Sequence, residues 1–487
     1  MDHQPEWGRK LSKCCLIPQR IILAFMCFWA IVICYATRVC LSHVVTVIVV
    51  KQNVTDKDTV CPREDTNDDS HDKDAVYEWS SNVVGLLLGV FFGTYVLLHI
   101  PGGLLSDKYG GKWVLFISMV VGAISVMLSP ISITMVDKDE LPWALVVMRT
   151  FLGASQGPLY PAVSSILSSW VPAKERGKLA AVTLGAGAFG SILSNSLSGV
   201  LLDKFDWPYT FYCFGMLNLI WCIPFGFMCF NYPATHPYLS EKEYNYLKGE
   251  MDTLERKIKP MPPWCAIFKS PAVWVMIIAQ VGHDWGLFVI LIDLPLYFSN
   301  VIGIPIMKNG FYSALPFLAL WISTIICGFL ADIIIKKEWL KINTQRIVFT
   351  VISSWAPGLL MVAASYAKCN IWLTVLLFTI CLATMGPYYS GLKLTPLDLS
   401  PNYAGTLTAI TNGIGSITGY LAPQAVGIIA KDSTLAQWRI VFWLSFGILF
   451  VTAIPFIFWG TGEKQDFDSV GDAKKEDKPK EEKPKTG

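Results

Sequence analysis

Charged residues are scarce in this sequence of 487 residues. Lys, Arg, Asp and Glu make up 16% of it, against about 25% in soluble proteins. A cytosolic enzyme of this length is therefore excluded. The formal net charge of only +2 gives no indication of nucleic-acid binding. No CxxC pair and no Cys/His cluster with metal-ligand spacing occurs, so no cofactor, metal or nucleic-acid partner is expected.

Long apolar runs stand where a soluble protein would carry charge. Each is about as long as the roughly 20 residues that cross a bilayer, and the charges lie in short clusters between them. They predict an all-α membrane protein with twelve transmembrane helices, surrounded by lipid. The predicted helices are 21–50, 82–106, 112–132, 142–168, 178–202, 208–230, 271–299, 309–335, 346–367, 371–394, 403–430 and 437–459.

Most of the 13 cysteines lie inside these runs, where a cysteine acts as a small apolar residue. Cys61 and Cys369 lie outside the runs, and both positions are compatible with an oxidising compartment. The sequence alone gives no support for a bridge between them.

The placement of Lys and Arg predicts the orientation. The leader 1–20, the linker 231–270 and the tail 460–487 are rich in basic residues, so both termini are expected in the cytoplasm. The tail is also dense in Glu, Asp and Pro and is expected to be disordered. Loop 51–81 is acidic and holds a glycosylation sequon at Asn53, so it is expected outside the cell or in a lumen. The membrane is either the plasma membrane or a vesicular or lysosomal one.

A repeated loop indicates that the chain is built twice. GGLLSDKYGGK at 102–112 returns in part as CGFLADIIIKK at 327–337, which places Gly103 and Gly328 in register. GPLY and GPYY recur in the same order, at 157–160 and 386–389. Two parallel six-helix halves, 21–230 and 271–459, are therefore predicted, as in one known transporter architecture.

The repeated loops are expected to control the conformational change. Gly103 lets helices approach closely, while Asp107, Lys112 and Asp332 are expected to form ion pairs that break when the halves rock. The alternative is a solvated turn with incidental charges.

Several motifs resemble one protein family. GGLLSDKYGGK is similar to the loop between the second and third helices of the major facilitator superfamily. YPAVSSILSSWVPAKERGKL (160–179) and LDLSPNYAGTLTAITNGIGSITGYLAP (397–423) resemble its anion–cation symporters, solute carrier family seventeen. This family includes sialin, the vesicular glutamate transporters and the sodium-dependent phosphate cotransporters. The resemblance implies a major facilitator fold, alternating access and an anionic substrate.

Two arginines in apolar helices are predicted to bind the anion. A charge at the bilayer centre costs about 2.5–3.5 kcal/mol on insertion scales, so Arg38 and Arg149 are expected to be functional. Two guanidinium groups can hold a carboxylate or phosphate in bidentate fashion. The resemblance also implies anion binding at both positions. The alternative for Arg38 is an interfacial residue whose side chain reaches the membrane surface.

Three positions depart from the family pattern. Gln156 stands where some relatives have a glutamate implicated in proton coupling, and it cannot titrate. His283 and Leu88 stand where vesicular glutamate transporters have an arginine and a histidine. These departures argue against a vesicular glutamate transporter and favour a smaller or less charged anion.

The seventh helix carries an acid and a histidine near the expected midplane. Asp284 and His283 can load and release a proton, or Asp284 can bind Na⁺ through oxygen. The alternative is that Asp284 only pairs with a neighbouring arginine. Asp293 is expected to be a rim or gate residue nearer the outer end.

Tyr160 and Asn412 fall in family motifs that line the cavity, so substrate contacts are predicted there. Helix–helix hydrogen bonds explain such residues equally well.

The sequence therefore predicts a symporter of inorganic phosphate or a small organic anion, coupled to Na⁺ or H⁺ and functional as a monomer. A membrane sensor that binds an anion without carrying it is the alternative. An integral membrane enzyme is disfavoured, because no His/Asp/Ser set clusters at one membrane depth.

Overall fold

A computed structural model describes residues 17–50, 61, 76–135, 137, 141–172, 179, 182–183, 185–251, 262–400 and 403–468. In these ranges the secondary structure is helical, apart from one isolated bridge between Val49 and Tyr77. Nine of the described helical segments are long and apolar enough to cross a membrane.

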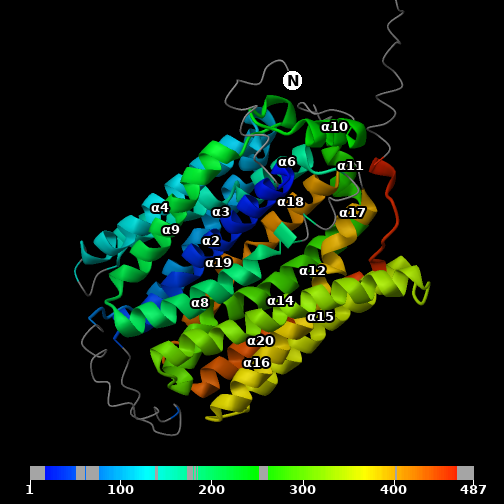
Figure 1. The fold of residues 1–487 in the computed structure, drawn as a ribbon. Helices are drawn as coiled ribbons and strands as arrows, with labels where there is room; N and C mark the ends of the chain where they lie inside the picture. Colours follow the sequence, from blue (N-terminus) through cyan, green and yellow to red (C-terminus); the bar gives the residue numbers. More distant parts are fainter. Residues whose placement is uncertain are drawn as a thin grey trace, which may run out of the picture.

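The first half of the chain forms a bundle of tilted helices (Figure 1). We call this bundle the N-half. Its helices are α2 (Gln19–Ile48), α3 (Ser81–Tyr109), α4 (Gly111–Thr134), α5 (Trp143–Gln156), α6 (Leu159–Trp170), α8 (Ala186–Lys204) and α9 (Pro208–Met228).

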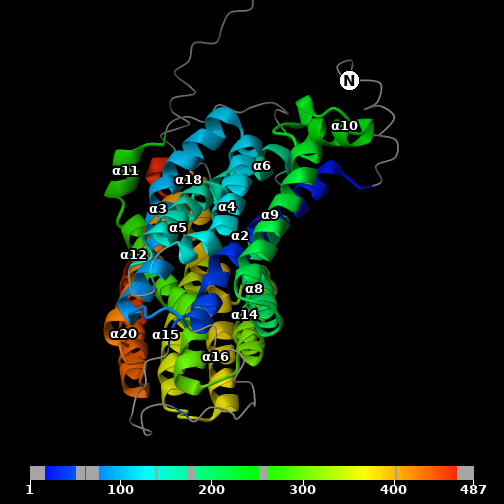
Figure 2. The same cartoon turned by 90° about the vertical axis from the view of Figure 1, so that its left-hand side faces the viewer.

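The second half, the C-half, packs beside it (Figures 1 and 2). Its seventh apolar run is one bent column of four elements: α12 (Pro271–Phe288), η3 (Val289–Asp293), α13 (Leu294–Tyr297) and η4 (Phe298–Ile302). The remaining elements are α14 (Ile306–Lys336), α15 (Ile342–Ser365), α16 (Ile371–Met385), η5 (Gly386–Tyr389), η6 (Leu392–Leu394), α17 (Thr395–Leu399), α18 (Ala404–Gly415), α19 (Thr418–Ile429), α20 (Leu435–Trp459) and η7 (Asp466–Asp468).

Each of the twelve predicted runs coincides with helical structure over its described residues, and three of them are interrupted by turns. The run 371–394 divides into α16, η5 and η6, with a turn at Ser390 and Gly391. The run 142–168 divides into α5 and α6 at Gly157 and Pro158, where proline supplies no backbone N–H. The run 403–430 divides into α18 and α19 at Ser416 and Ile417. Neighbouring helices satisfy freed backbone groups at such breaks in a membrane protein.

The linker between the halves folds over one end of the molecule (Figure 2). It contains η2 (Pro233–Thr235), α10 (Glu241–Glu250) and α11 (Trp264–Lys269). Glu243 of α10 accepts hydrogen bonds from the backbone N–H groups of Gln19 (2.7 Å) and Arg20 (3.1 Å). Its carboxylate therefore caps the N-terminus of α2. Burial lowers the pKa of His236 to about 4, which leaves this linker histidine neutral.

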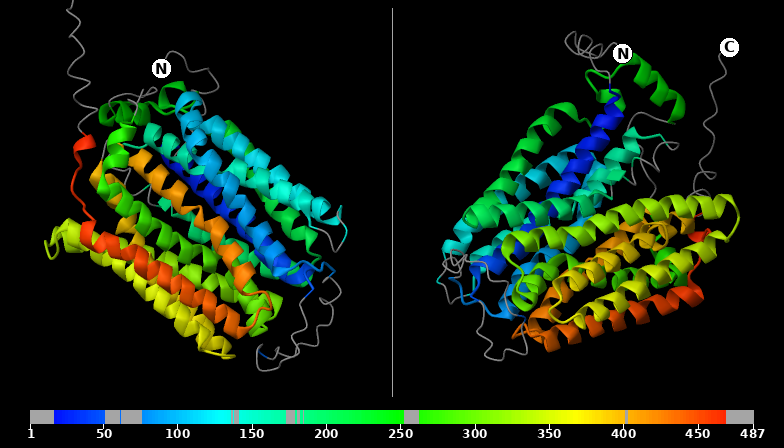
Figure 3. Two further views of the ribbon diagram at one scale, coloured as in Figure 1. Left: turned by 180° about the vertical axis from the view of Figure 1, so that it is seen from behind. Right: turned by 60° about the horizontal axis from the view of Figure 1, so that its bottom comes forward.

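We call the end that carries α10 the inner end and the opposite end, which carries Cys61, the outer end. The start of α2 and the end of α20 lie at the same end of the two helical bundles (Figure 3).

The halves touch along two seams near the outer end, where α8 packs on α14 and α3 packs on α19. Small residues permit this close approach. A Cβ atom added to Gly310 of α14 would lie 2.5 Å from the carbonyl oxygen of Asn195 in α8. A Cβ atom added to Gly85 of α3 would lie 2.6 Å from the carbonyl oxygen of Pro423 in α19. The outer end is thus closed by backbone-to-backbone packing.

A chain of hydrogen bonds crosses the seam between α8 and α14. His43 of α2 contacts Asn195 through Nε2 and Oδ1 at 2.7 Å, and Asn195 donates to the carbonyl of Ser313 at 3.4 Å. Ser313 donates to Asn309 at 2.9 Å. His43 is therefore part of a helix contact in this closed arrangement.

Cys61 and Cys369 form a disulfide, with their Cα atoms 5.4 Å apart. This corrects the sequence-based view that such a bridge lacked support. The cysteines are 308 residues apart, so only the pairing of the two halves brings them together. The backbone N–H of Cys61 also donates to the carbonyl of Val301 at 3.0 Å. The bridge joins the first outer loop to the turn between α15 and α16, across the two halves.

Cys61 and Cys369 are expected to react with a maleimide only after reduction, because their thiols are consumed in the bridge. Mass spectrometry of alkylated membranes checks this. Cys265, an exposed free cysteine at the inner end, is the matched control and should react without reduction in permeabilised membranes. Labelling of Cys61 before reduction would contradict the assignment.

Candidate functional site

Arg38 of α2 lies inside the molecule, with 5% of its surface exposed. Aromatic rings surround its guanidinium group: Tyr35 at 4.5 Å, Phe91 at 4.7 Å and Tyr95 at 5.1 Å from the ring centroids. Its Nη2 donates to Gln156 at 3.3 Å, while its Nε is buried without a hydrogen-bond partner. Rings partly compensate a buried cation but supply no negative charge.

Arg149 of α5 lies beside it and is 3% exposed. It donates to two backbone carbonyls, that of Leu87 at 3.3 Å and that of Arg38 at 3.5 Å. Phe91 lies between the two arginines, with its ring centroid 5.5 Å from the Arg149 guanidinium carbon. Both arginines line one small cavity between the halves, with Ile292 of η3 on the opposite wall.

Neither arginine has an ion pair with a carboxylate within the described ranges of the chain. As far as the described residues show, two guanidinium groups thus share a cavity inside the membrane without a counter-charge. Such a pair can accept an anion in a bidentate contact. The structure therefore brings together the two arginines that the sequence singled out.

Gln156 lies beside Arg38, and both the nitrogen and the oxygen of its side-chain amide form hydrogen bonds. Its Nε2 donates to the hydroxyl of Thr37 at 3.0 Å, and its Oε1 accepts from Arg38. The site thus has a neutral amide where the family resemblance indicates an acid in some relatives.

Tyr160 of α6 is connected to the arginines through Tyr35. Its hydroxyl donates to that of Tyr35 at 3.3 Å, and the Arg38 guanidinium group lies over the Tyr35 ring. Both tyrosines line a second cavity between the halves, opposite Leu291 and Tyr389 of the C-half. Tyr160 therefore faces the space between the halves.

His283 and Asp284 lie in a separate cluster on the C-half. Asp284 accepts from Gln280 at 2.8 Å, and Gln280 accepts from the hydroxyl of Tyr388 at 2.6 Å. The His283 ring stacks on that of Tyr388, with centroids 3.6 Å apart. His283 Nδ1 is 3.5 Å from Asp284 Oδ1, which is an ion-pair distance when the ring is protonated. In the described part of the chain neither ring nitrogen has another polar partner.

Lys393 of η6 is a member of this cluster that the sequence analysis missed. Its ammonium group donates to Oδ1 of Asn412, lies 5.7 Å from the Tyr388 ring centroid, and is close enough to Asp284 for their charges to interact. The predicted substrate-binding residue Asn412 therefore accepts a hydrogen bond from a cation of the same half, the C-half. Lys393 lies at the end of the run 371–394, where a lysine resembles a boundary residue.

The predicted gating residues take different positions. Gly103 lies in α3 facing Pro161, at ordinary contact distance, whereas its neighbour Gly102 packs tightly on Pro158. The Lys112 ammonium lies over the ring of Phe230 at 4.2 Å, and Asp332 is exposed on α14. Asp107 belongs to α3, but its side chain lies outside the described residues, as does Asn53 with its sequon. The gating role of these residues stays a prediction.

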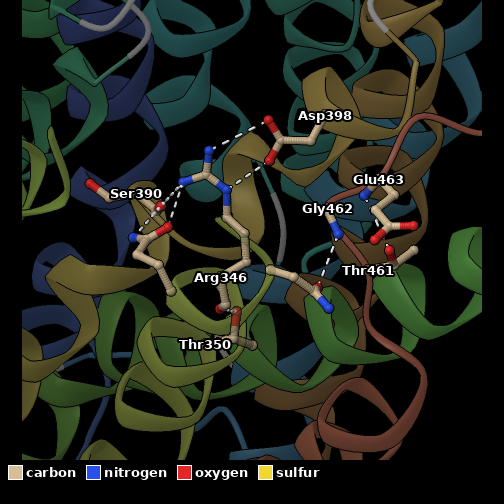
Figure 4. Close-up of polar contacts among 9 residues, drawn as sticks. Arg346, Thr350, Ser390, Asp398, Thr461, Gly462 and Glu463 are labelled. Carbon is tan, nitrogen blue, oxygen red and sulfur yellow. Dashed lines mark hydrogen bonds and ion pairs between the residues drawn. The ribbon is translucent and has the colours of Figure 1, made fainter. Parts of the chain in front are cut away.

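A polar cluster around Arg346 at the inner end of the C-half was also missed by the sequence analysis (Figure 4). Arg346 of α15 forms an ion pair with Asp398 of α17 at 2.7 Å and donates to the carbonyl of Ser390 at 2.6 Å. The side chains of Arg346 and Asp398 are 7% and 17% exposed, respectively. The cluster ties α15 to α17 and to the segment between η5 and η6.

Arg346→Ala is expected to destabilise the protein by about 1–3 kcal/mol, because Asp398 would lose a charge-assisted hydrogen bond. Thermal unfolding of the detergent-solubilised protein checks this. Arg346→Lys should restore only part of the loss, since lysine lacks the planar fork. Lys341→Ala, at an exposed position, is the control. Equal stability of Arg346→Ala and Lys341→Ala would refute the role of the pair.

The sequence matches the family model described as Major Facilitator Superfamily over residues 21–423. Solved transporters share the fold. One is a bacterial homolog of the human lysosomal transporter Spinster, in an inward-facing and occupied conformation, with a TM-score of 0.67 at 12% identity, covering 91% of this chain and 97% of that one. Another is a D-xylose-proton symporter, with a TM-score of 0.65 at 15% identity, covering 91% and 98%. The protein is a multi-pass membrane transporter of the Major Facilitator Superfamily.

More similar relatives narrow the class. A Drosophila ananassae protein with the provisional name inorganic phosphate cotransporter is 32% identical over 408 residues, which are 82% of this chain and 83% of the relative. Human sialin is 31% identical over 460 residues, 93% of this chain and 91% of sialin. The chain therefore belongs to the anion–cation symporter family, solute carrier family seventeen, as its motifs predicted.

Proposed function

We propose that this protein is a secondary active symporter that carries a small anion, inorganic phosphate or a small organic anion, together with Na⁺ or H⁺. One observation carries the proposal. Arg38 and Arg149 lie buried between the halves, and no carboxylate pairs with them in the described residues. A pair of uncompensated charges in a membrane is stabilised when an anion enters. The relatives named inorganic phosphate cotransporter and sialin support the same substrate class.

The remaining polar residues are assigned by position. Arg38 and Arg149 form the anion clamp, and Tyr160 extends it through Tyr35. On the C-half, His283, Asn412 and Lys393 supply further polar contacts as the halves approach one another. Alternating access then consists of rocking that opens either end in turn.

The driving ion is assigned to the seventh helix. Gln156 cannot titrate, so the coupling group is sought elsewhere, and Asp284 is the carboxylate beside Lys393 and His283. Binding of H⁺ or Na⁺ at Asp284 would release Lys393 toward the anion. The ion and the anion would thereby bind in a linked manner.

The orientation follows from the charge pattern. The inner end, with the basic linker, is placed in the cytoplasm. The outer end, with the disulfide, then faces an oxidising exterior or lumen. The membrane is the plasma membrane or a lysosomal or vesicular membrane.

Counterflow in proteoliposomes tests the proposal. Labelled inorganic phosphate and labelled sialate are each offered to vesicles loaded with the same unlabelled anion. A Na⁺ gradient and a pH gradient are then imposed separately. Exchange of one anion, and its accumulation under one gradient, is the expected result. Binding of the anion without any exchange would favour the alternative function, a sensor on a transporter scaffold.

A further inference from the structure

Asp293 is a buried acid for which the proposed anion site has no use. It lies at the end of η3, a π-helical segment, and is 1% exposed. Its Oδ2 has no hydrogen-bond partner, and the described residues form no ion pair with it. Single-turn π-helical segments inside α-helices frequently mark functional sites. A second such segment, η4, follows four residues later.

The surroundings of Asp293 lack a stable counter-charge. η3 packs against α2, α12, α13 and α19. Apart from cysteines, the ionisable side chains on these elements are Arg20, Tyr35, Arg38, His43, His283, Asp284, Tyr297 and Tyr420. Within the described residues Arg38 forms no ion pair with Asp293 in this closed arrangement, and His43 is engaged with Asn195. The hydroxyl of Tyr297, one helical turn from Asp293, is itself buried without a partner.

We propose that Asp293 is a proton-binding site that controls closure of the outer end. A carboxylate buried in apolar surroundings without a partner cannot remain ionised, so closure selects the neutral acid. Na⁺ is the poorer occupant, because a hard cation takes several oxygen ligands and Asp293 Oδ2 has no polar partner among the described residues.

The position of Asp293 connects the proton to the conformational cycle. η3 contacts α2 of the N-half, and its Ile292 lines the cavity of Arg38 and Arg149. When the halves separate at the outer end, this contact opens and water reaches η3. Asp293 can then exchange its proton with the outer compartment. Only the protonated form is buried again when the outer end closes.

Infrared spectroscopy of the reconstituted full-length protein at pH 7 tests the site without any substrate. The carbonyl-stretch band of a protonated carboxylic acid is expected in the native protein and should be lost in Asp293→Asn. Asp293→Glu, which retains an acid, should keep such a band. Asp206→Asn, which alters an exposed acid at the outer end, should leave the spectrum unchanged. An identical band in the native protein and Asp293→Asn would overturn the proposal.

A transport measurement tests the consequence, and this part rests on the proposed anion exchange. The rate of phosphate or sialate counterflow should fall as the outer pH rises in the native protein, because the ionised acid resists closure. Asp293→Asn is always neutral and should exchange at a rate independent of outer pH. An unchanged pH dependence in Asp293→Asn would refute control by this residue. Absence of counterflow in every variant would instead count against the proposed function, and the infrared band would still decide the proton site.

Discussion

Arg149→Ala is expected to abolish anion uptake while leaving the amount of protein in the membrane unchanged. The substitution removes a guanidinium group that could form two charge-assisted hydrogen bonds with the anion, each worth about 1.5–3 kcal/mol. A loss of about 3–6 kcal/mol corresponds to a decrease of roughly a hundredfold or more in affinity. Initial uptake rates in proteoliposomes, normalised to reconstituted protein, measure the effect. Arg38→Ala should have the same consequence.

Two controls distinguish anion binding from folding. Arg149→Lys keeps the charge but loses the planar fork, so it should recover little uptake. Arg439→Ala removes a guanidinium group that packs on Tyr366 in the C-half, at 4.2 Å from the ring centroid, and should retain uptake. Normal uptake by Arg149→Ala would refute the anion clamp, because no other residue pair in the described cavity carries two positive charges.

The fold was predictable because bilayer crossing leaves a strong one-dimensional signal. Apolar runs of about 20 residues, and the return of the loop around Gly103 near Gly328, require no knowledge of tertiary contacts. The disulfide between Cys61 and Cys369 shows the opposite case. Its cysteines are 308 residues apart, and their proximity depends on how the halves pack. Spacing along the chain carries no information of that kind.

The site was predictable where the residue type alone is costly in a membrane. Arg38 and Arg149 are conspicuous because a guanidinium group needs a reason to be there. Lys393 is equally charged, but it lies where the apolar run ends, so helix geometry was needed to place it beside Asn412. Arg346 likewise resembles the first residue of a run, and its partner Asp398 lies 52 positions away.

Asp284→Asn is expected to eliminate concentrative uptake and to spare downhill exchange. The substitution keeps the shape of the side chain and its hydrogen bond from Gln280, while it removes the negative charge next to Lys393 and His283. Without that charge neither H⁺ nor Na⁺ has a site beside Lys393, so ion binding there is no longer linked to anion binding. Exchange requires only rocking of the anion-loaded protein, and the anion clamp is untouched.

Two assays on the same proteoliposomes separate these effects. Accumulation is measured under an imposed Na⁺ or pH gradient, and counterflow is measured with no gradient. Accumulation by Asp284→Asn should be near zero, while its counterflow should be near the native rate. His283→Ala should shift the pH dependence of accumulation if H⁺ is the driving ion, and change it little if Na⁺ is. If Asp284→Asn still accumulates the anion against its gradient, Asp284 is only a structural partner of Lys393 and Gln280. The driving ion would then have to act at another acid, and Asp293 is the buried carboxylate on the same helical column.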